Sequence, residues 1–305
     1  MKRLFLLLPI LVATVVLAGC SFQTPAVTNE NSDETVRIAV SIVPYVDLVE
    51  QVGGDRVTVF SIIPEGFSPE VYEPTPQEMR KLAQADIVVL NGGLSFETAL
   101  EEKIRESNPS ARIIRLNDAL RPEDLVSLES HAHDDGEVPD ANTGGVDPHT
   151  WLSPSVLARQ IPSIVTALQQ VDEASAQEYQ FRGEETVATL TDLAAELQAA
   201  LAPFQGRAFL VYHPAFGYFA HEFGLEQHFI EVEGKEPSAA QLKESIEAIR
   251  SENIRVVFLE KQFSTRSAEA LAQEIDAEVV YVNPLAQNYS ENLHTLANHI
   301  INSLY

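Results

Sequence analysis

The chain of 305 residues contains one cysteine, Cys20, so it has no second thiol with which that residue can pair. An intrachain disulfide is therefore excluded, and so is a metal site built from several thiolates. Copper(I) and iron–sulfur chemistry, which rely on soft sulfur ligands, do not fit this composition. Any metal ligands must come from imidazole nitrogens or side-chain oxygens.

Basic residues are also scarce, with 20 Lys and Arg against 45 Asp and Glu and a formal net charge of −25. A surface this acidic disfavours nucleic acid and anionic substrates, and it raises the local concentration of cations. Solubility alone would explain most of these carboxylates. The net charge therefore argues against nucleic acid and anionic substrates as partners, but it does not identify a binding site.

The chain has no apolar run long enough to cross a membrane, because the run from Leu4 to Leu17 is too short to span the hydrocarbon. Lys2 and Arg3 precede this run, and Leu17-Ala18-Gly19-Cys20 ends it. A basic start, a short apolar segment and small residues at the break are typical of an exported signal peptide. We expect a signal peptide over residues 1–19, and a retained membrane anchor is the alternative.

The sequence Leu-Ala-Gly-Cys after such a leader resembles the lipobox of bacterial lipoproteins, which implies cleavage before Cys20 and acylation of its thiol and new amine. The segment up to residue 35 is polar, contains Pro25 and shows no periodicity, which predicts a flexible tether over residues 20–35. We therefore expect a lipid-anchored protein outside the cytoplasm, in the periplasm or at the cell surface.

From residue 36 onward, apolar runs typical of buried strands alternate with amphipathic helical patterns. The predicted strands are 37–43, 57–63, 87–90, 111–116, 208–212, 229–232, 256–259 and 278–282. The predicted helices are 45–52, 77–84, 96–105, 155–170, 173–201, 216–222, 239–251 and 268–275. This order implies parallel sheets covered on both faces. We expect an α/β fold with two similar lobes, 36–171 and 203–305, each a parallel sheet flanked by helices, joined by one long rigid helix within 172–202.

Four potential ligands lie beside prolines in loops or at the ends of predicted strands. They are Glu70, His149, His213 and Asn283. Ligands of open parallel sheets bind beyond the carboxyl ends of the strands, where such loops meet. Two imidazoles with one or two oxygens suit a divalent transition ion. A continuous His-Glu-x-x-His motif is absent, so the prediction of a metal site rests on the positions of these residues in loops and at strand ends.

Three of the four candidates also have an ordinary structural interpretation. His149 would pack beside the single tryptophan, Trp151; His213 would be a buried core histidine; and Glu70 would accept backbone hydrogen bonds in a turn. Two further histidines, His131 and His133, lie in a polar segment over 128–146 that predicts a mobile surface loop. They would form at most a weak accessory metal site, and a solvated loop is the alternative.

Several motifs resemble those of the metal-specific solute-binding lipoproteins of bacterial ABC importers, the zinc and manganese family. They are Ser41-Ile42-Val43-Pro44, Tyr72-Glu73-Pro74-Thr75-Pro76, Asp147-Pro148-His149 with Trp151-Leu152, and Tyr212-His213-Pro214-Ala215-Phe216-Gly217. The resemblance runs from about residue 36 to the C-terminus. It implies two α/β lobes bridged by a long helix and delivery of a metal ion to a membrane permease, without catalysis.

Within this resemblance, His149 and His213 stand where the family places ligands, and a histidine at 213 is similar to the zinc-type branch. Two positions depart from the family pattern: Glu70 replaces a usual histidine, and Asn283 replaces a usual aspartate. Oxygen at position 70 moves the site toward harder ions such as manganese or iron(II). Glu260, at the end of a predicted strand, is expected to compensate by ligating or by holding His213.

We therefore expect a lipid-anchored receptor that captures a divalent metal in the cleft between the lobes, with zinc favoured over manganese, and delivers it to an ABC permease. We expect a monomer that binds no nucleic acid. One alternative is a zinc hydrolase in which Glu260 acts as the base. The other is an adhesin or metal chaperone on the same scaffold.

Overall fold

The structure is a computed structural model, and it describes residues 35–127, 145–231, 254–260, 262 and 265–304. Several of the predictions above lie outside these residues. They are the signal peptide, Cys20, the tether up to residue 34, His131 and His133, and the helix over 239–251. Within the described part of the chain, no helix has the length and apolarity needed to cross a membrane.

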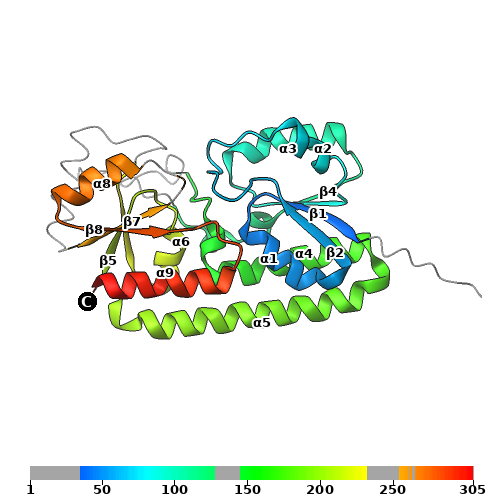
Figure 1. The fold of residues 1–305 in the computed structure, drawn as a ribbon. Helices are drawn as coiled ribbons and strands as arrows, with labels where there is room; N and C mark the ends of the chain where they lie inside the picture. Colours follow the sequence, from blue (N-terminus) through cyan, green and yellow to red (C-terminus); the bar gives the residue numbers. More distant parts are fainter. Residues whose placement is uncertain (1–34, 128–144, 232–253, 261, 263–264, 305) are drawn as a thin grey trace, which may run out of the picture. The chain divides into compact units, whose positions relative to one another are not determined.

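The first half of the described chain forms a parallel sheet of four strands in the order β2-β1-β3-β4. The strands are β1 (Val36–Val40), β2 (Val57–Ser61), β3 (Ile87–Leu90) and β4 (Arg112–Arg115). The helices of this half are α1 (Pro44–Gly53), α2 (Pro76–Leu82), α3 (Ser95–Ser107) and α4 (Pro154–Val171). Figure 1 shows α2 and α3 on one side of the sheet and α1 and α4 on the other. Because β3 is buried at all four positions, both faces of the sheet are covered.

The second half repeats this order as β6-β5-β7-β8, again with parallel strands. Its strands are β5 (Ala208–Val211), β6 (Glu226–Phe229), β7 (Val256–Glu260) and β8 (Glu278–Val282). Its described helices are α6 (Gly217–Phe223), α8 (Thr265–Glu274) and α9 (Tyr289–Leu304). The matching strand order confirms the predicted fold class of two similar α/β halves.

One predicted strand was misplaced, and one helix was not predicted. Strand β6 begins three residues before the predicted 229–232, because it is an edge strand of mostly polar, partly exposed residues with little apolar signal. Helix α9 was not predicted, although it buries Leu293, Leu296, Ala297 and Ile300 at helical spacing. The repeat of apolar residues every three or four positions would have identified it.

The long helix α5 (Ala176–Leu201, 26 residues) connects the halves, and a short 3₁₀ turn (Glu173–Ser175) precedes it. It contacts α1 and α4 of the first half and α9 of the second, and Figure 1 shows it running beneath both. At the crossing with α4, a Cβ added to Gly183 would lie 2.3 Å from a methyl carbon of Val165. One buried apolar cluster includes Trp151, Leu197 and Phe216 and is continuous across both halves. The two halves are therefore joined by packing as well as by the chain.

Candidate metal site

His149 lies in the loop between β4 and α4, and the preceding carboxylate fixes its ring. Its backbone N–H donates to Asp147 Oδ1 at 2.8 Å, and its Nδ1 lies 2.7 Å from the same oxygen. The side chain is almost fully buried and packs edge-on against Trp151. Because Nδ1 faces a carboxylate, Nδ1 carries the proton and the lone pair of Nε2 is left for a ligand.

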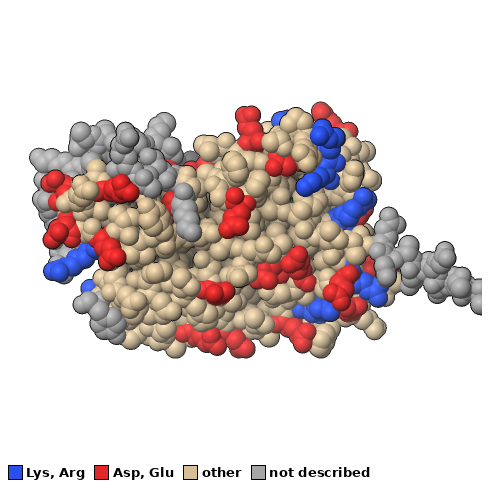
Figure 2. Space-filling model, in the orientation of Figure 1, with Lys and Arg blue, Asp and Glu red and all other residues tan. Residues whose placement is uncertain are grey.

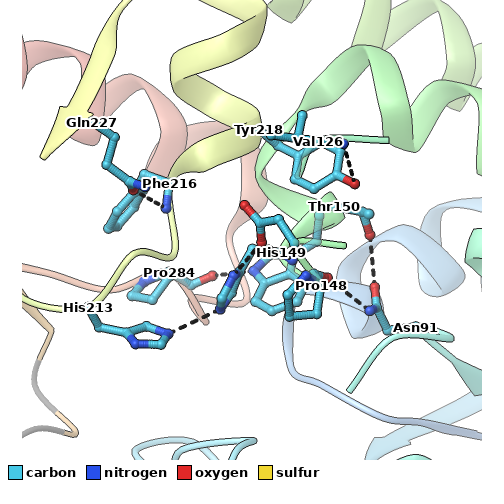
Figure 3. A network of polar contacts seen from close by, with 12 residues as sticks. Asn91, Val126, Pro148, His149, Thr150, His213, Phe216, Tyr218, Gln227 and Pro284 are labelled. Atoms are coloured by element: carbon cyan, nitrogen blue, oxygen red, sulfur yellow. Dashed lines mark hydrogen bonds and ion pairs between the residues drawn. The ribbon is translucent and has the colours of Figure 1, made fainter. Parts of the chain in front are cut away.

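A buried polar network anchors this loop to the first sheet (Figure 3). Asn91 follows β3, donates to the carbonyl oxygen of Pro148 at 2.9 Å, and accepts from the hydroxyls of Thr150 at 2.9 Å and Tyr45 at 2.6 Å. On the other side, the indole N–H of Trp151 donates to the carbonyl oxygen of Pro284 in the second half, at 2.8 Å. The loop that carries His149 is therefore held by both halves.

His213 follows β5 at the carboxyl end of the second sheet, and it is also almost fully buried. Its Nδ1 lies 3.0 Å from Glu231 Oε2, so Glu231 orients this ring as Asp147 orients the other. Its backbone N–H donates to Glu260 Oε2 at 3.4 Å. Glu231 was not predicted as a site residue. It lies two residues beyond the end of β6, at the same sheet edge as His213. Because β6 was predicted three residues too late in the chain, the sequence did not place Glu231 at that edge.

Glu70 reaches the two histidines from the proline-rich loop after β2. Its Oε1 lies 3.1 Å from His213 Nε2, and its side chain is 32% exposed, whereas those of His149 and His213 are 7% and 6% exposed. Within the described residues, Glu70, His149 and His213 form the group of potential metal ligands whose donor atoms all lie within 4.8 Å of one another. The structure thus brings together three of the four predicted ligands.

The spacing of these atoms matches the geometry of a metal shell. The Nε2 atoms of His149 and His213 are 3.2 Å apart, and the Glu70 oxygen is 3.1 Å from His213 Nε2. Figure 3 shows the two histidine rings pointing toward each other. Two ligand atoms at about 2.0–2.1 Å from a tetrahedral zinc ion lie about 3.3 Å from each other. The cavity between these three residues has a volume of about 10 Å³. That volume admits a single ion or water rather than an organic substrate.

The surroundings of His213 are strongly acidic. Burial alone would lower the pKa of His213, but the hydrogen bond with Glu231 and the charges of Glu70 and Glu260 raise it above its usual value. Burial raises the pKa of Glu260 to about 8, although His213 opposes that shift. One oxygen each of Glu231 and Glu260 is buried without a hydrogen-bond partner among the described residues. These carboxylates favour a cation at His213, whether a proton or a metal ion.

The other two predicted site residues, Asn283 and Glu260, do not line the cavity that Glu70, His149 and His213 share. Asn283 Oδ1 accepts a hydrogen bond from the backbone N–H of Leu285 at 3.0 Å. Asn283 lines a separate cavity beside α9 and is not part of the lining of the 10 Å³ cavity. Glu260 is fully buried and lies outside the group of potential ligands formed by Glu70, His149 and His213. Its hydrogen bond with His213 is made to the backbone N–H of that residue.

These features define a class: a two-lobed α/β protein with a group of potential metal ligands around a small cavity at the ends of its parallel sheets. Residues 38–303 match the family model described as ZnuA, the periplasmic component A of the zinc-uptake complex, and the chain belongs to this family. It is a family of substrate-binding proteins of metal transport, which confirms the expectation that the chain is not an enzyme and removes the hydrolase alternative.

Known relatives support this assignment over most of their length. The high-affinity zinc uptake protein ZnuA of Bacillus subtilis is 27% identical over 276 residues, which cover 89% of this chain and 85% of that protein. A crystal structure of ZnuA superposes with a TM-score of 0.81 at 38% identity, covering 89% of this chain and all of that one. The structure of FpvC from Pseudomonas aeruginosa with Mn²⁺ has a TM-score of 0.73 at 27% identity, with 89% and 99% covered.

Proposed function

We propose that this chain captures a divalent transition ion outside the cytoplasm, with zinc favoured over manganese, and delivers it to the permease of an ABC importer. The observation that carries the proposal is the approach of His149 Nε2, His213 Nε2 and Glu70 Oε1 around one ion-sized cavity. The relatives named for zinc uptake support the choice of cargo. Acylation at Cys20, implied by the lipobox, would keep the receptor beside its permease.

The three donor atoms favour zinc and also allow manganese to bind. Two imidazole nitrogens suit zinc, and one carboxylate oxygen completes three protein ligands with a fourth position for water or the second oxygen of Glu70. Asp147 and Glu231 hold the two rings so that both Nε2 lone pairs point into the cavity. A harder oxygen donor at Glu70 also accommodates manganese, which FpvC binds in its structure.

Release of the ion would begin at Glu70. The loop of His149 is fixed by the Asn91 network and by the contact of Trp151 with Pro284, and α5 limits rotation of the halves. Glu70 is the most exposed of the three ligands, and its loop carries the exposed side chains of Phe67 and Val71. A small displacement of this loop removes one ligand while both histidines stay in place.

Isothermal titration calorimetry and native mass spectrometry of the metal-free soluble part test this function. We expect one zinc ion per chain, and loss of at least about 100-fold in affinity in His149→Ala and in His213→Ala. His221→Ala is the matched control, because His221 is exposed on α6 and distant from the cavity lining. A His213→Ala variant that keeps the affinity of the parent protein would contradict the proposed site.

A further inference from the structure

Strand β4 (Arg112–Arg115) forms an open edge of the first sheet. It pairs with β3 on one side, in the register Val88↔Ile113 and Leu90↔Arg115, and no described strand pairs with its other side. The outward N–H and C=O groups of an edge strand are free to pair with another extended chain. The groove over this edge shares no lining residue with the ion-sized cavity.

A groove lies over this edge. A cavity of about 550 Å³ is lined by all four residues of β4, by α3 on one side and by α4 on the other. Ile113 and Ile114 are half-buried on opposite faces of the sheet, each packed against a different apolar cluster, so the groove offers the free backbone of the edge strand. The helices stand on opposite faces of the sheet (Figure 1), and the edge strand lies between them.

Four arginines line this groove against two carboxylates, although the whole chain has a net charge of −25. They are Arg105, Arg112, Arg115 and Arg159. Figure 2 shows the Lys and Arg side chains of the visible face mostly on the first half, whereas Asp and Glu are spread over both halves. A positive groove on an acidic protein attracts negatively charged groups that the rest of the surface repels.

Three of these guanidinium groups are held in place by carboxylates. Buried Glu101 binds Arg105 Nη2 and Arg115 Nη2, each at 2.5 Å, and Asp124 binds Arg159. Arg112 is exposed and makes no ion pair with the residues that the structure describes. Anchored guanidinium groups keep their remaining N–H donors in a fixed orientation, which suits recognition of carboxylates.

We propose that the groove over β4 binds an extended acidic segment of a partner protein, which adds to the sheet as a fifth strand. Main-chain hydrogen bonds to β4 would supply affinity, and alternate carboxylates of the partner would meet the arginines. The same arginines disfavour pairing of β4 with a second copy of itself, since that would place like charges together. The site is independent of the metal site and of the proposed transport function.

The test uses two synthetic peptides of equal length, one alternating Glu with Val and the other alternating Lys with Val. We expect the Glu peptide to bind the full soluble part, with amide shifts and slowed hydrogen exchange by NMR at Ile113 and Arg115, whose N–H groups face the open edge, and to weaken as salt rises. Arg112→Glu should weaken this binding at least about tenfold, as loss of a charge-assisted contact predicts. Arg80→Glu, an exposed arginine of α2 outside the groove, should leave it unchanged.

Three results would overturn the proposal. Equal binding of the Lys peptide, or full affinity in Arg112→Glu, would show that the arginines do not select the ligand. Binding of the Glu peptide without protection of the Ile113 and Arg115 amides would show charge attraction without strand pairing. Binding of phosphatidylglycerol vesicles that Arg112→Glu abolishes, with no binding of the Glu peptide, would assign the groove to a membrane surface instead.

Discussion

His149 Nε2 lies 3.2 Å from His213 Nε2, although 64 residues separate the two histidines in the chain. Each ring has a carboxylate at its Nδ1, namely Asp147 and Glu231, so both Nε2 atoms present lone pairs to the same point. Two lone pairs this close repel each other unless a proton or a metal ion lies between them. A cation held between the two Nε2 atoms would remove this repulsion, and the predictions below follow from this arrangement.

The residue at position 70 should set the choice of ion. Glu70→His replaces an oxygen ligand by an imidazole nitrogen, so we expect the ratio of zinc affinity to manganese affinity to rise by at least about tenfold. Glu70→Gln should weaken both ions, because it removes the negative charge from the shell. Competitive titration of the variants with both metals measures this ratio. An unchanged ratio in Glu70→His would mean that Glu70 does not ligate the ion.

Asn283 should prove dispensable for metal binding. Its side-chain oxygen accepts from the Leu285 N–H, and Asn283 is not among the residues that line the ion-sized cavity. We expect Asn283→Ala to keep zinc affinity within about threefold, and to lower the free energy of unfolding by about 1 kcal/mol through loss of that hydrogen bond. Calorimetric titration and chemical denaturation of the same sample give both values. A loss of affinity as large as that of His149→Ala would restore Asn283 as a ligand.

Metal binding should compete with a proton at His213. The pKa of His213 is raised by Glu231, Glu70 and Glu260 against the opposing effect of burial, so zinc affinity should rise with pH until the pH exceeds this raised pKa. The stability of the metal-free protein should change in the opposite direction: it should fall as pH rises through the pKa of His213, because the raised pKa favours the folded, protonated form.

Glu231→Gln is the variant that isolates this effect. Without the carboxylate, the pKa of His213 falls, and the rise of zinc affinity with pH should move to lower pH. At high pH the variant should bind about 10–100-fold more weakly than the parent, because the ring loses its orienting partner. Zinc titrations between about pH 5.5 and about pH 8.5 separate the two effects. An identical pH profile in parent and variant would exclude this role of Glu231.

The crossing of α4 and α5 should depend on the absence of a side chain at Gly183. An added Cβ would lie 2.3 Å from Val165 Cγ2, so Gly183→Ala should destabilise the protein by about 1–3 kcal/mol. The double variant Val165→Ala/Gly183→Ala provides the matched control, since shortening Val165 makes room for the new methyl group. We expect thermal unfolding to show partial recovery in the double variant. Full stability of Gly183→Ala would mean that the helices shift apart at no cost.

The sequence was informative wherever a local pattern determines the structure. The apolar runs of β3 and β5 and the long uninterrupted pattern of α5 predicted the repeated α/β halves, and the prolines beside His149 and His213 marked the loops that carry ligands. The edge strand β6 is polar and has no such pattern, so its position was predicted wrongly. As a result, Glu231 was not predicted as the partner of His213. The side-chain oxygen of Asn283 accepts a hydrogen bond from the backbone N–H of Leu285, and residue type alone does not indicate this contact.

The most direct test of metal binding by Glu70, His149 and His213 is a crystal structure of the zinc-loaded soluble part with anomalous diffraction at the zinc absorption edge. We expect one strong anomalous peak bound by His149 Nε2, His213 Nε2 and a carboxylate oxygen of Glu70, with nitrogen ligands at about 2.0–2.1 Å. Zinc bound elsewhere on the molecule, with these three side chains unliganded, would contradict it.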